Sequence, residues 1–244
     1  MTETVLILGG RSDIGLACAH AFAAEGHPVQ LAARRADTLE AERRDVALRH
    51  GVEVTLHELD ALDLAGHEAF ASGLDPAPGI VVCAIGALGE QDRDEADHDA
   101  AAAVMRANFE GPATLLAVFA NRMAARGDGV LVGISSVAGD RGRATNYIYG
   151  SAKAGFTAYL SGLRNRLAKQ GVHVVTVKPG FVATRMTDGM DLPEKLTAEP
   201  EAVAQAILKA VRRRRNVIYV KPVWWLVMTV IGAIPEGVFK RMRI

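Results

Sequence analysis

The sequence predicts an α/β protein: a doubly wound parallel sheet of about seven strands with helices on both faces. Short apolar, β-branched runs alternate with longer Ala-rich stretches up to about residue 220, and half of the 244 residues are hydrophobic. Strands that alternate with helices of this length form right-handed βαβ units around a buried parallel sheet. We therefore expect one domain, residues 1–220, followed by a hydrophobic and basic extension, residues 221–244.

The expected elements follow this alternation in order. Strands are predicted at residues 4–9, 28–33, 52–56, 80–84, 129–134, 172–178 and 217–220. Helices are predicted between them, at residues 14–25, 36–50, 64–72, 97–126, 147–169 and 200–213. Five acids in one short stretch indicate a solvated helix start: Asp92, Asp94, Glu95, Asp97 and Asp99.

The composition narrows the possible partners. The chain has 28 Lys and Arg residues against 28 Asp and Glu residues, so it lacks the basic excess of a nucleic-acid-binding protein. Its seven His residues show no metal-site spacing, and Cys18 and Cys83 are expected to be buried, reduced thiols. No signal peptide precedes the first apolar run, residues 5–8. We expect a cytoplasmic protein with neither a metal nor a nucleic-acid partner.

The first predicted strand ends in a glycine-rich turn, Leu8-Gly9-Gly10-Arg11-Ser12-Asp13-Ile14-Gly15, that leads directly into a helix. Glycine lets the backbone approach a pyrophosphate closely, and the helix N-terminus offers N–H groups and a positive dipole end. Gly15 allows close packing of the helix. Because the turn follows the first strand, it predicts a dinucleotide site; a tight turn without a ligand is the alternative. The contacts predicted here are Gly9, Arg11, Ser12, Asp13, Ile14 and Gly15.

Tyr149 and Lys153 lie four residues apart in a predicted helix, so their side chains share one face. A phenol, with a pKa of about 10, exchanges protons poorly near neutrality. An ammonium one turn away favours the phenolate and is expected to lower that pKa. Ser136 follows the fifth predicted strand and is expected to hydrogen-bond a substrate oxygen. These residues predict a proton-transfer site, whereas a surface Tyr and Lys is the alternative reading of the spacing alone.

With these motifs, the chain resembles the short-chain dehydrogenase/reductase family over roughly residues 4–220. The resemblance implies a Rossmann-type, NAD(P)-dependent oxidoreductase that acts on a carbonyl/alcohol pair. It implies a catalytic tetrad of Asn108, Ser136, Tyr149 and Lys153, in which Asn108 holds a water that relays protons to Lys153. Tyr149 and Lys153 are also expected to contact the cofactor.

Further properties follow from the same resemblance. The helices at 97–126 and 147–169 are expected to form a homodimer or homotetramer, and residues 185–200 to form a mobile substrate lid. Asp60 is expected at the adenine, and Thr184 at the nicotinamide carboxamide. The remaining contacts implied on the nicotinamide side are Pro179, Gly180 and Val182.

The chain departs from the family pattern at two places. The middle glycine of the first motif is Asp13, which is expected to face outward and cap the helix, because an inward carboxylate would repel a pyrophosphate. The Asn-Asn-Ala-Gly motif reads Cys83-Ala84-Ile85-Gly86. Ala84 and Gly86 are still expected to contact the cofactor, Gly86 by allowing close approach to the adenosine ribose.

The end of the second predicted strand favours NADP(H) over NAD(H). An acid there would bind the ribose 2′-OH of NAD, but this chain has Ala33. Arg34 follows, and its guanidinium suits a 2′-phosphate. Arg11 is expected to reach the same region, and Arg35 to begin a solvated helix.

The extension contains an uncharged run, residues 223–234, with Trp224 and Trp225, followed by Lys240, Arg241 and Arg243. The run is shorter than the roughly 20 residues that span a bilayer. Tryptophan with flanking cations nevertheless suits contact with a membrane interface through residues 222–244. A helix packed over the substrate cleft, or against a second copy of the chain, is the alternative.

Particular segments, including Gly139-Asp140-Arg141-Gly142-Arg143 and residues 234–241, are similar to decaprenylphosphoryl-keto-ribose reductases, which implies a lipid-linked keto-sugar. We therefore expect an NADP(H)-dependent enzyme that reduces a lipophilic or lipid-linked ketone, or works in reverse, in the cytoplasm or at the inner face of the membrane. A reductase of small hydrophobic ketones and a catalytically silent dinucleotide-binding scaffold are the alternatives.

Overall fold

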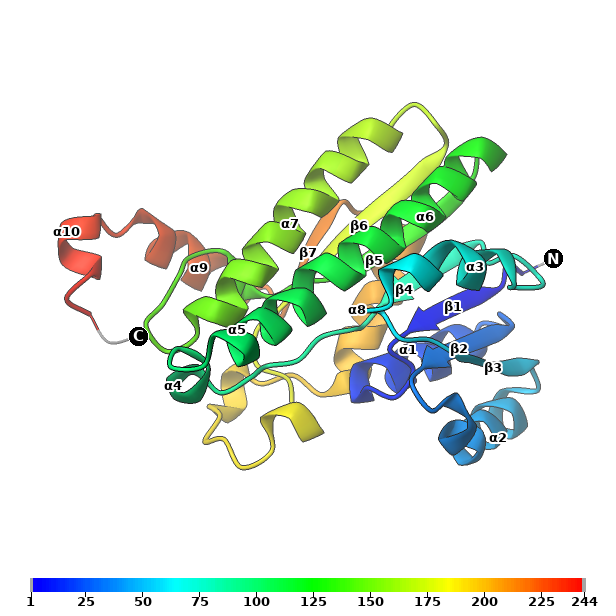
Figure 1. Ribbon diagram of the computed structural model, residues 1–244, viewed down its shortest axis with the longest axis horizontal. Coiled ribbons are helices and arrows are strands. Elements are labelled where there is room, and N and C mark those ends of the chain that lie inside the picture. Colours follow the sequence, from blue (N-terminus) through cyan, green and yellow to red (C-terminus); the bar gives the residue numbers. More distant parts are fainter. Residues whose placement is uncertain (1, 243–244) are drawn as a thin grey trace.

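The computed structural model, which describes residues 2–242, contains a sheet of seven parallel strands (Figure 1). The strand order is β3-β2-β1-β4-β5-β6-β7. The chain starts near the middle of the sheet, adds strands on one side as far as β3, and then crosses back to β4 and adds strands on the other side. The strands are β1 (Val5–Leu8), β2 (Val29–Ala33), β3 (Val54–Glu58), β4 (Ile80–Cys83), β5 (Gly129–Ile134), β6 (Val172–Pro179) and β7 (Val217–Val220). The predicted doubly wound parallel sheet is confirmed.

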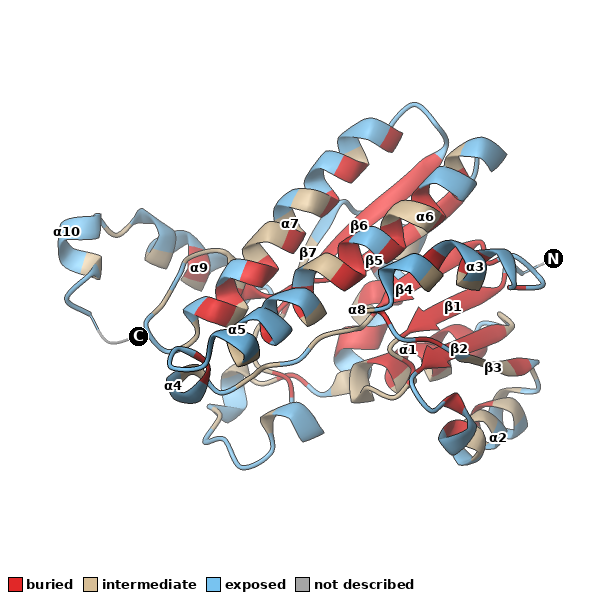
Figure 2. Cartoon of the chain, viewed as in Figure 1, coloured by how far each residue is buried: buried red, intermediate tan, exposed pale blue. Residues whose placement is uncertain are grey.

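The central strands are continuous apolar runs because they are covered on both faces. Every residue of β1, β2 and β4 is buried (Figure 2). In register, Val5 lies between Val29 of β2 and Ile80 of β4. All seven predicted strands are present, and their ends differ from the prediction by two residues at most.

Helices form one layer on each face of the sheet. On one face, Phe22, Val46 and Ile207 pack against the strands from α1 (Asp13–Ala23), α2 (Glu40–His50) and α8 (Pro200–Arg212). On the other, Phe119 and Phe156 belong to a second core beneath α3, α6 and α7. The bounds on this second face are α3 (His67–Ser72), α4 (Gln91–Asp94), α5 (His98–Met105), α6 (Gly111–Arg126) and α7 (Tyr147–Leu167).

The helix predicted at 97–126 is present, but it is not α-helical throughout. A π-helical turn, Arg106–Glu110, separates α5 from α6. Pro112 has no N–H to donate to the carbonyl of Asn108 four residues earlier, and the N–H of Gly111 donates instead to the carbonyl of Arg106. Such turns occur frequently at functional sites, and this one contains Asn108.

The acidic stretch near residue 95 has two structural roles. Asp97 caps α5 by accepting hydrogen bonds from the N–H groups of Asp99 and Ala100, as expected of a helix start. Asp94 is buried instead of solvated, and it ends α4, which was not predicted. Its carboxylate accepts from the N–H of Glu90 at 2.8 Å and pairs with Arg93.

The extension forms two helices, α9 (Val223–Ala233) and α10 (Glu236–Phe239), at one end of the molecule (Figure 1). Arg141, in the loop between β5 and α7, holds them in place. Its guanidinium donates to the carbonyls of Ile231 and Ile234 at 2.7 and 2.6 Å and pairs with Glu236. It also lies 3.7 Å from the ring centroid of Phe239. Within residues 2–242, no helix combines the length and apolarity needed to cross a membrane, and Arg243 lies outside the described residues.

Candidate active site

A cavity of about 1200 Å³ opens at the carboxyl ends of the strands. This is the edge at which parallel α/β sheets bind ligands, where the strand order reverses. The volume exceeds the roughly 300–1000 Å³ of a typical small-molecule site, so it suits a dinucleotide together with a substrate. Every predicted site residue except Gly15 lines it: Gly9, Arg11, Ser12, Asp13, Ile14, Arg34, Asp60, Ala84, Gly86, Asn108, Ser136, Tyr149, Lys153, Pro179, Gly180, Val182 and Thr184.

The glycine-rich turn is shaped by close backbone contacts. Gly9 has a φ of +89°, and a Cβ there would lie 2.9 Å from the carbonyl carbon of Ala84. A Cβ at Gly15 would lie 2.5 Å from the carbonyl oxygen of Gly9, so a glycine at this position allows α1 to pack closely against the turn. Gly15 does not line the cavity, and its role as a cofactor contact stays a prediction. Ser12 caps α1, because its Oγ accepts from the N–H of Gly15 at 3.0 Å.

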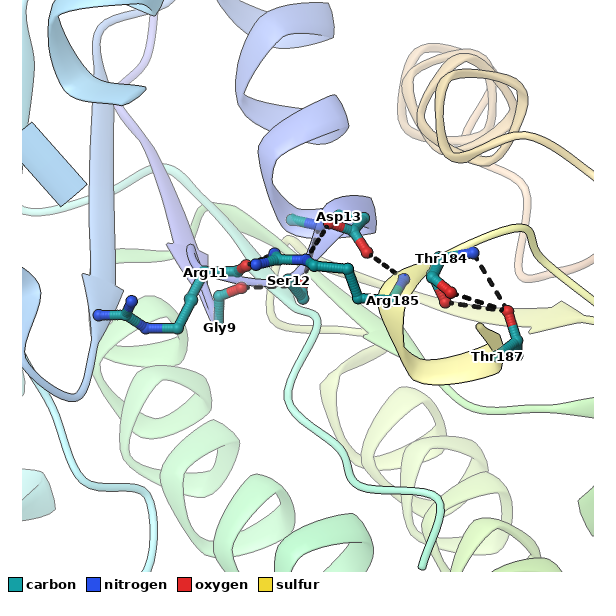
Figure 3. A network of polar contacts seen from close by, with 8 residues as sticks. Gly9, Arg11, Ser12, Asp13, Thr184, Arg185 and Thr187 are labelled. Carbon is teal, nitrogen blue, oxygen red and sulfur yellow. Dashed lines mark hydrogen bonds and ion pairs between the residues drawn. The ribbon is translucent and has the colours of Figure 1, made fainter. Parts of the chain in front are cut away.

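Asp13 does not cap the helix, because Ser12 occupies that position. Its carboxylate instead binds Arg185, at the start of the predicted lid (Figure 3). The Nε and the backbone N–H of Arg185 donate to the two carboxylate oxygens at 2.8 and 2.7 Å, and the guanidinium also donates to the carbonyl of Arg11 at 2.5 Å. The lid is therefore tied to the glycine-rich turn, and the negative charge of Asp13 is compensated.

The mouth of the cavity near the end of β2 is cationic. Arg11 donates to the carbonyls of Arg34 and Arg35 at 3.0 and 2.9 Å, so it reaches the predicted region. Arg34 is exposed at the rim, and Arg35 precedes a short 3-10 turn, as expected of a solvated helix start. Glu58 was not predicted as a site residue; its carboxylate accepts from the N–H groups of Arg35 and Ala36, both at 2.8 Å. These hydrogen bonds lower the pKa of Glu58 and fix the turn that presents Arg34.

Two other predicted contacts also shape backbone turns. Asp60 accepts from the N–H of Leu62 at 2.9 Å, just after β3. The backbone N–H of Thr184 donates to the hydroxyl of Thr187 at 3.1 Å, and the two hydroxyls lie 3.4 Å apart (Figure 3). Both residues line the cavity while stabilising its wall.

Tyr149 and Lys153 lie on α7, as predicted, beside the end of β5. Lys153 is buried; its Nζ donates to the carbonyl of Ile134 at 3.1 Å and lies 5.7 Å from the centroid of the Tyr149 ring. The hydroxyl of Ser136 accepts from the N–H of Ala138 at 3.1 Å and is close enough to the Tyr149 phenol to lower its pKa. Ser135 is used differently, because its hydroxyl donates to the carbonyl of Lys153 at 2.9 Å and so fixes α7 to β5.

Burial dominates the protonation of this pair. It raises the pKa of Tyr149 to about 12, and the nearby Ser136 hydroxyl opposes the rise. It lowers the pKa of Lys153 to about 8. The expectation that Lys153 lowers the pKa of Tyr149 was wrong for this structure, because the ammonium lies over the ring and donates to a backbone carbonyl. Tyr149 is therefore a neutral phenol near pH 7.

Asn108 is fully buried and fixes the loop after β4. Its amide donates to the carbonyls of Ala87 and Val104 at 2.6 and 2.8 Å. A Cβ at Gly86 would lie 2.7 Å from the Oδ1 of Asn108 and 3.3 Å from the Nζ of Lys153. Gly86 therefore leaves room for these two side chains, which differs from its predicted role beside a ribose, and Asn108 positions the surroundings of Lys153.

Trp224 lines the cavity and contacts residues that are distant from it in the sequence. Its buried indole lies directly on Gly180, where a Cβ would overlap it, and packs edge-to-face against Phe181. The indole N–H donates to the carbonyl of Leu196, in the lid, at 3.1 Å. One side of α9 thus packs over the cleft, which was the alternative reading of the extension.

The chemistry of the remaining candidates is limited. Within residues 2–242, no group of three His, Cys, Asp or Glu side chains is placed to hold a metal ion. Cys18 and Cys83 are buried as expected, and burial raises their pKa values to about 12 and about 11.

The short chain dehydrogenase family model matches residues 3–195 of this chain. Together with the fold and the cavity, this match shows that the chain belongs to the short-chain dehydrogenase/reductase family. It is an NAD(P)-dependent oxidoreductase.

The chain is similar to several known proteins over nearly its whole length. An uncharacterized oxidoreductase of Mycobacterium tuberculosis is 39% identical over 241 residues, covering 98% of this chain and 96% of the relative. One from Streptomyces coelicolor is 36% identical, with the same coverage. A short-chain dehydrogenase from Sphingobium yanoikuyae, solved in complex with NADPH, is 28% identical with a TM-score of 0.80, covering 99% of this chain and 96% of that one. The bulky-bulky ketone specific alcohol dehydrogenase from Comamonas testosteroni is 25% identical with a TM-score of 0.78, covering 99% and 95%.

The Asp13–Arg185 ion pair predicts a compensatory pair of substitutions. Arg185→Met leaves the Asp13 carboxylate uncompensated beside the anion-binding end of α1, and it is expected to weaken NADPH binding about tenfold. Adding Asp13→Asn should restore most of the affinity, because it removes the repulsion. Fluorescence titration of NADPH measures both effects. Unchanged affinity in Arg185→Met would show that Asp13 does not act on the cofactor.

Because Lys153 is buried, replacing it with an apolar residue is expected to raise the free energy of unfolding in a pH-dependent way. Below about pH 8 the folded chain holds a buried ammonium, which costs folding free energy. This cost disappears as the pH rises from the folded pKa of about 8 towards the ordinary lysine pKa of 10.5. Lys153→Met is therefore expected to be more stable than the wild type by about 1–3 kcal/mol near pH 7. The gain should shrink by about pH 10. Urea unfolding at both pH values measures it, and a gain that is independent of pH contradicts the assignment.

Proposed function

We propose that the chain transfers hydride between NADP(H) and the carbonyl/alcohol pair of a lipophilic or lipid-linked ketone or keto-sugar, with Tyr149 as general acid/base. The observation that carries this proposal is that the half-buried phenol of Tyr149 lies beside Lys153 and shares one cavity with Ser136 and the glycine-rich turn. A phenol that stays protonated near pH 7 is available as a proton donor to a carbonyl oxygen.

Each residue has a defined task in the reducing direction. NADPH, when bound, supplies the hydride. Tyr149 donates its proton to the carbonyl oxygen, and Ser136 orients that oxygen by a hydrogen bond. Lys153 binds the nicotinamide ribose, while Asn108 maintains the surroundings of Lys153 and supports its proton supply. Burial of the site limits access of water.

The cavity fits a dinucleotide with a 2′-phosphate. Gly9 brings the backbone close, Ser12 caps α1 beneath the turn, and Arg11 and Arg34 supply cations where β2 ends. Ala33 replaces the acid that would favour NAD. The Sphingobium protein in complex with NADPH supports this choice, although a 25% identical reductase from Brucella melitensis was solved with NAD. The other proposed contacts are Asp13, Ile14, Asp60, Ala84, Gly86, Tyr149, Lys153, Pro179, Gly180, Val182 and Thr184.

The proposal of a lipophilic substrate is supported by the apolar part of the cavity. Leu88, Phe181, Met186, Met190 and Trp224 line it. The Comamonas enzyme, named for bulky ketones, supports a large apolar substrate rather than a small one. A lipid-linked keto-sugar and a small soluble ketone would differ in their need for a membrane surface.

The outer side of α9 supports contact with an anionic lipid surface. Trp225, Leu226 and Val230 are each more than half exposed, while Trp224 and Met228 face inward. Exposed aromatic and aliphatic side chains near cations suit the membrane interface, and Lys240 and Arg241 follow α10. We therefore propose that the enzyme works in the cytoplasm, at the inner face of the membrane. The homodimer or homotetramer implied by the resemblance stays a prediction that light scattering can check.

Tyr149→Phe tests the proposed chemistry. It removes the proton donor, so NADPH oxidation with a lipophilic ketone should fall at least about a hundredfold, while NADPH binding stays nearly intact. Tyr147→Phe is the matched control, because Tyr147 is exposed and bonds Glu95 outside the proposed chemistry. Equal activity of Tyr149→Phe and the wild type would refute the role. If the wild type fails to oxidise NADPH with any of the ketones and keto-sugars, the catalytically silent scaffold is favoured.

Arg34→Ala tests the proposed cofactor preference. Loss of a charge-assisted bond to the 2′-phosphate should weaken NADPH binding about tenfold and leave NADH binding nearly unchanged. Calorimetric titration with both cofactors measures the ratio. Arg213→Ala, an exposed arginine after α8, is the control. Equal losses for both cofactors would remove Arg34 from phosphate recognition.

The proposed lipid contact is tested by vesicle co-sedimentation. A triple variant, Trp225→Ser, Leu226→Ser and Val230→Ser, should lose most binding to phosphatidylglycerol vesicles, because it removes the exposed apolar side chains. Leu48→Ser is the control, because Leu48 is 84% exposed on α2, away from this helix. Equal binding of the triple variant and the wild type would overturn the proposal.

A further inference from the structure

The cavity is cationic although the chain has no formal net charge. Among residues 2–242, its lining contains two acids, Asp13 and Asp60, and Asp13 is paired with Arg185. The lining also contains these cationic side chains: Arg11, Arg34, Arg35, Arg93, Arg143, Lys153 and Arg185. The proposed function gives Arg11, Arg34 and Lys153 a task, and Arg93 and Arg185 pair with carboxylates. It gives Arg143 no task.

Arg143 is a partly buried cation with an unsatisfied donor. Its Nε is buried and has no hydrogen-bond partner within residues 2–242, and burial lowers its pKa. The side-chain oxygen of Asn146, also in the cavity lining, is likewise buried and without a partner in this part of the chain. A buried N–H without an acceptor costs free energy, so the Nε of Arg143 points to a missing ligand with acceptor oxygens, whereas the Asn146 oxygen requires a hydrogen-bond donor.

The loop that carries these residues is held rigidly beside the catalytic tyrosine. Arg143 and Asn146 lie between β5 and α7, just before Tyr149, and the N–H of Asn146 donates to the carbonyl of Arg143 at 3.1 Å. Asp140 anchors the same loop by pairing with Lys178 at 2.5 Å. Arg141 anchors it to the C-terminal helices. The guanidinium of Arg143 is therefore presented from a fixed backbone.

The position of this loop separates Arg143 from the proposed 2′-phosphate site. Arg34 follows β2, whereas Arg143 follows β5, and three strand spacings separate the two strands in the order β2-β1-β4-β5. At about 4.8 Å per spacing, the strands are about 14 Å apart. Arg143 is thus on the Tyr149 side of the cavity, where the proposed function places the substrate.

We propose that Arg143, assisted by the amide of Asn146, forms an oxyanion-binding subsite, so that the substrate carries a phosphate ester or a carboxylate in addition to its carbonyl group. A guanidinium presents paired donors that match either oxyanion. The amide nitrogen of Asn146 can donate to the same oxyanion, and its oxygen can accept from a hydroxyl group of the ligand. This inference rests on the proposed function, because it assumes that a carbonyl substrate occupies the cavity beside Tyr149.

The experiment compares matched substrates on the NADPH-saturated enzyme. The probes are a medium-chain keto-alkyl phosphate with its dephosphorylated keto-alcohol, and a keto acid with its methyl ester. We expect the wild type to have a higher kcat/KM for one anion than for its neutral partner. In Arg143→Met, which removes the charge but keeps an unbranched side chain, that preference should fall about tenfold or more. Arg143→Lys should recover part of it, and Arg166→Met, an exposed arginine on α7, should not change it.

The outcomes separate this inference from the function on which it rests. A preference for the phosphate identifies a phosphate ester, and a preference for the keto acid identifies a carboxylate; either supports the subsite if it depends on Arg143. Equal use of anionic and neutral ketones, or a preference that survives Arg143→Met, overturns the subsite while leaving the reductase intact. If the enzyme reduces none of the four probes and none of the ketones of the Tyr149→Phe test, both the proposed function and the subsite are overturned.

Discussion

The geometry of the site depends on one constraint, the close contact between the ends of β1 and β4. Parallel strands buried on both faces bring their following loops to one edge, and the strand order reverses between these two strands. Leu8 pairs with Cys83, so the turns that follow must pass within van der Waals contact. Gly9 makes this possible because it has neither a Cβ nor a barrier to its positive φ. The same edge then receives the residues that follow β5 and β6.

Charge is distributed unevenly at this edge. A neutral chain concentrates its cations around one cavity, and Lys153 is buried beside an aromatic ring and a backbone carbonyl. Such groups cost folding free energy, a cost that proteins retain at functional sites. The pair Asp13–Arg185 acts in the opposite sense, because it compensates the carboxylate nearest to the glycine-rich turn.

Elements governed by local patterns were predictable from the sequence, and contacts between distant segments were not. The seven strands were found because burial on both faces requires continuous apolar runs. The π-helical turn at Asn108 was missed because the Ala-rich pattern continues through Pro112, although that proline was the available signal. The cap was misassigned by one residue, since Ser12 and Asp13 both suit a helix N-terminus. The place of Trp224 on Gly180 joins residues from different elements, and no local pattern specifies it.

The anchoring of α9 and α10 by Arg141 couples the C-terminal segment to the loop before Tyr149. One guanidinium satisfies carbonyl groups at the end of α9, where a helix has no partners of its own for them. A chimera that exchanged this segment with that of a relative would therefore have to preserve both the arginine and the acceptors it serves. Engineering or evolutionary drift in the two regions is thus expected to be correlated, although about 90 residues separate them along the chain.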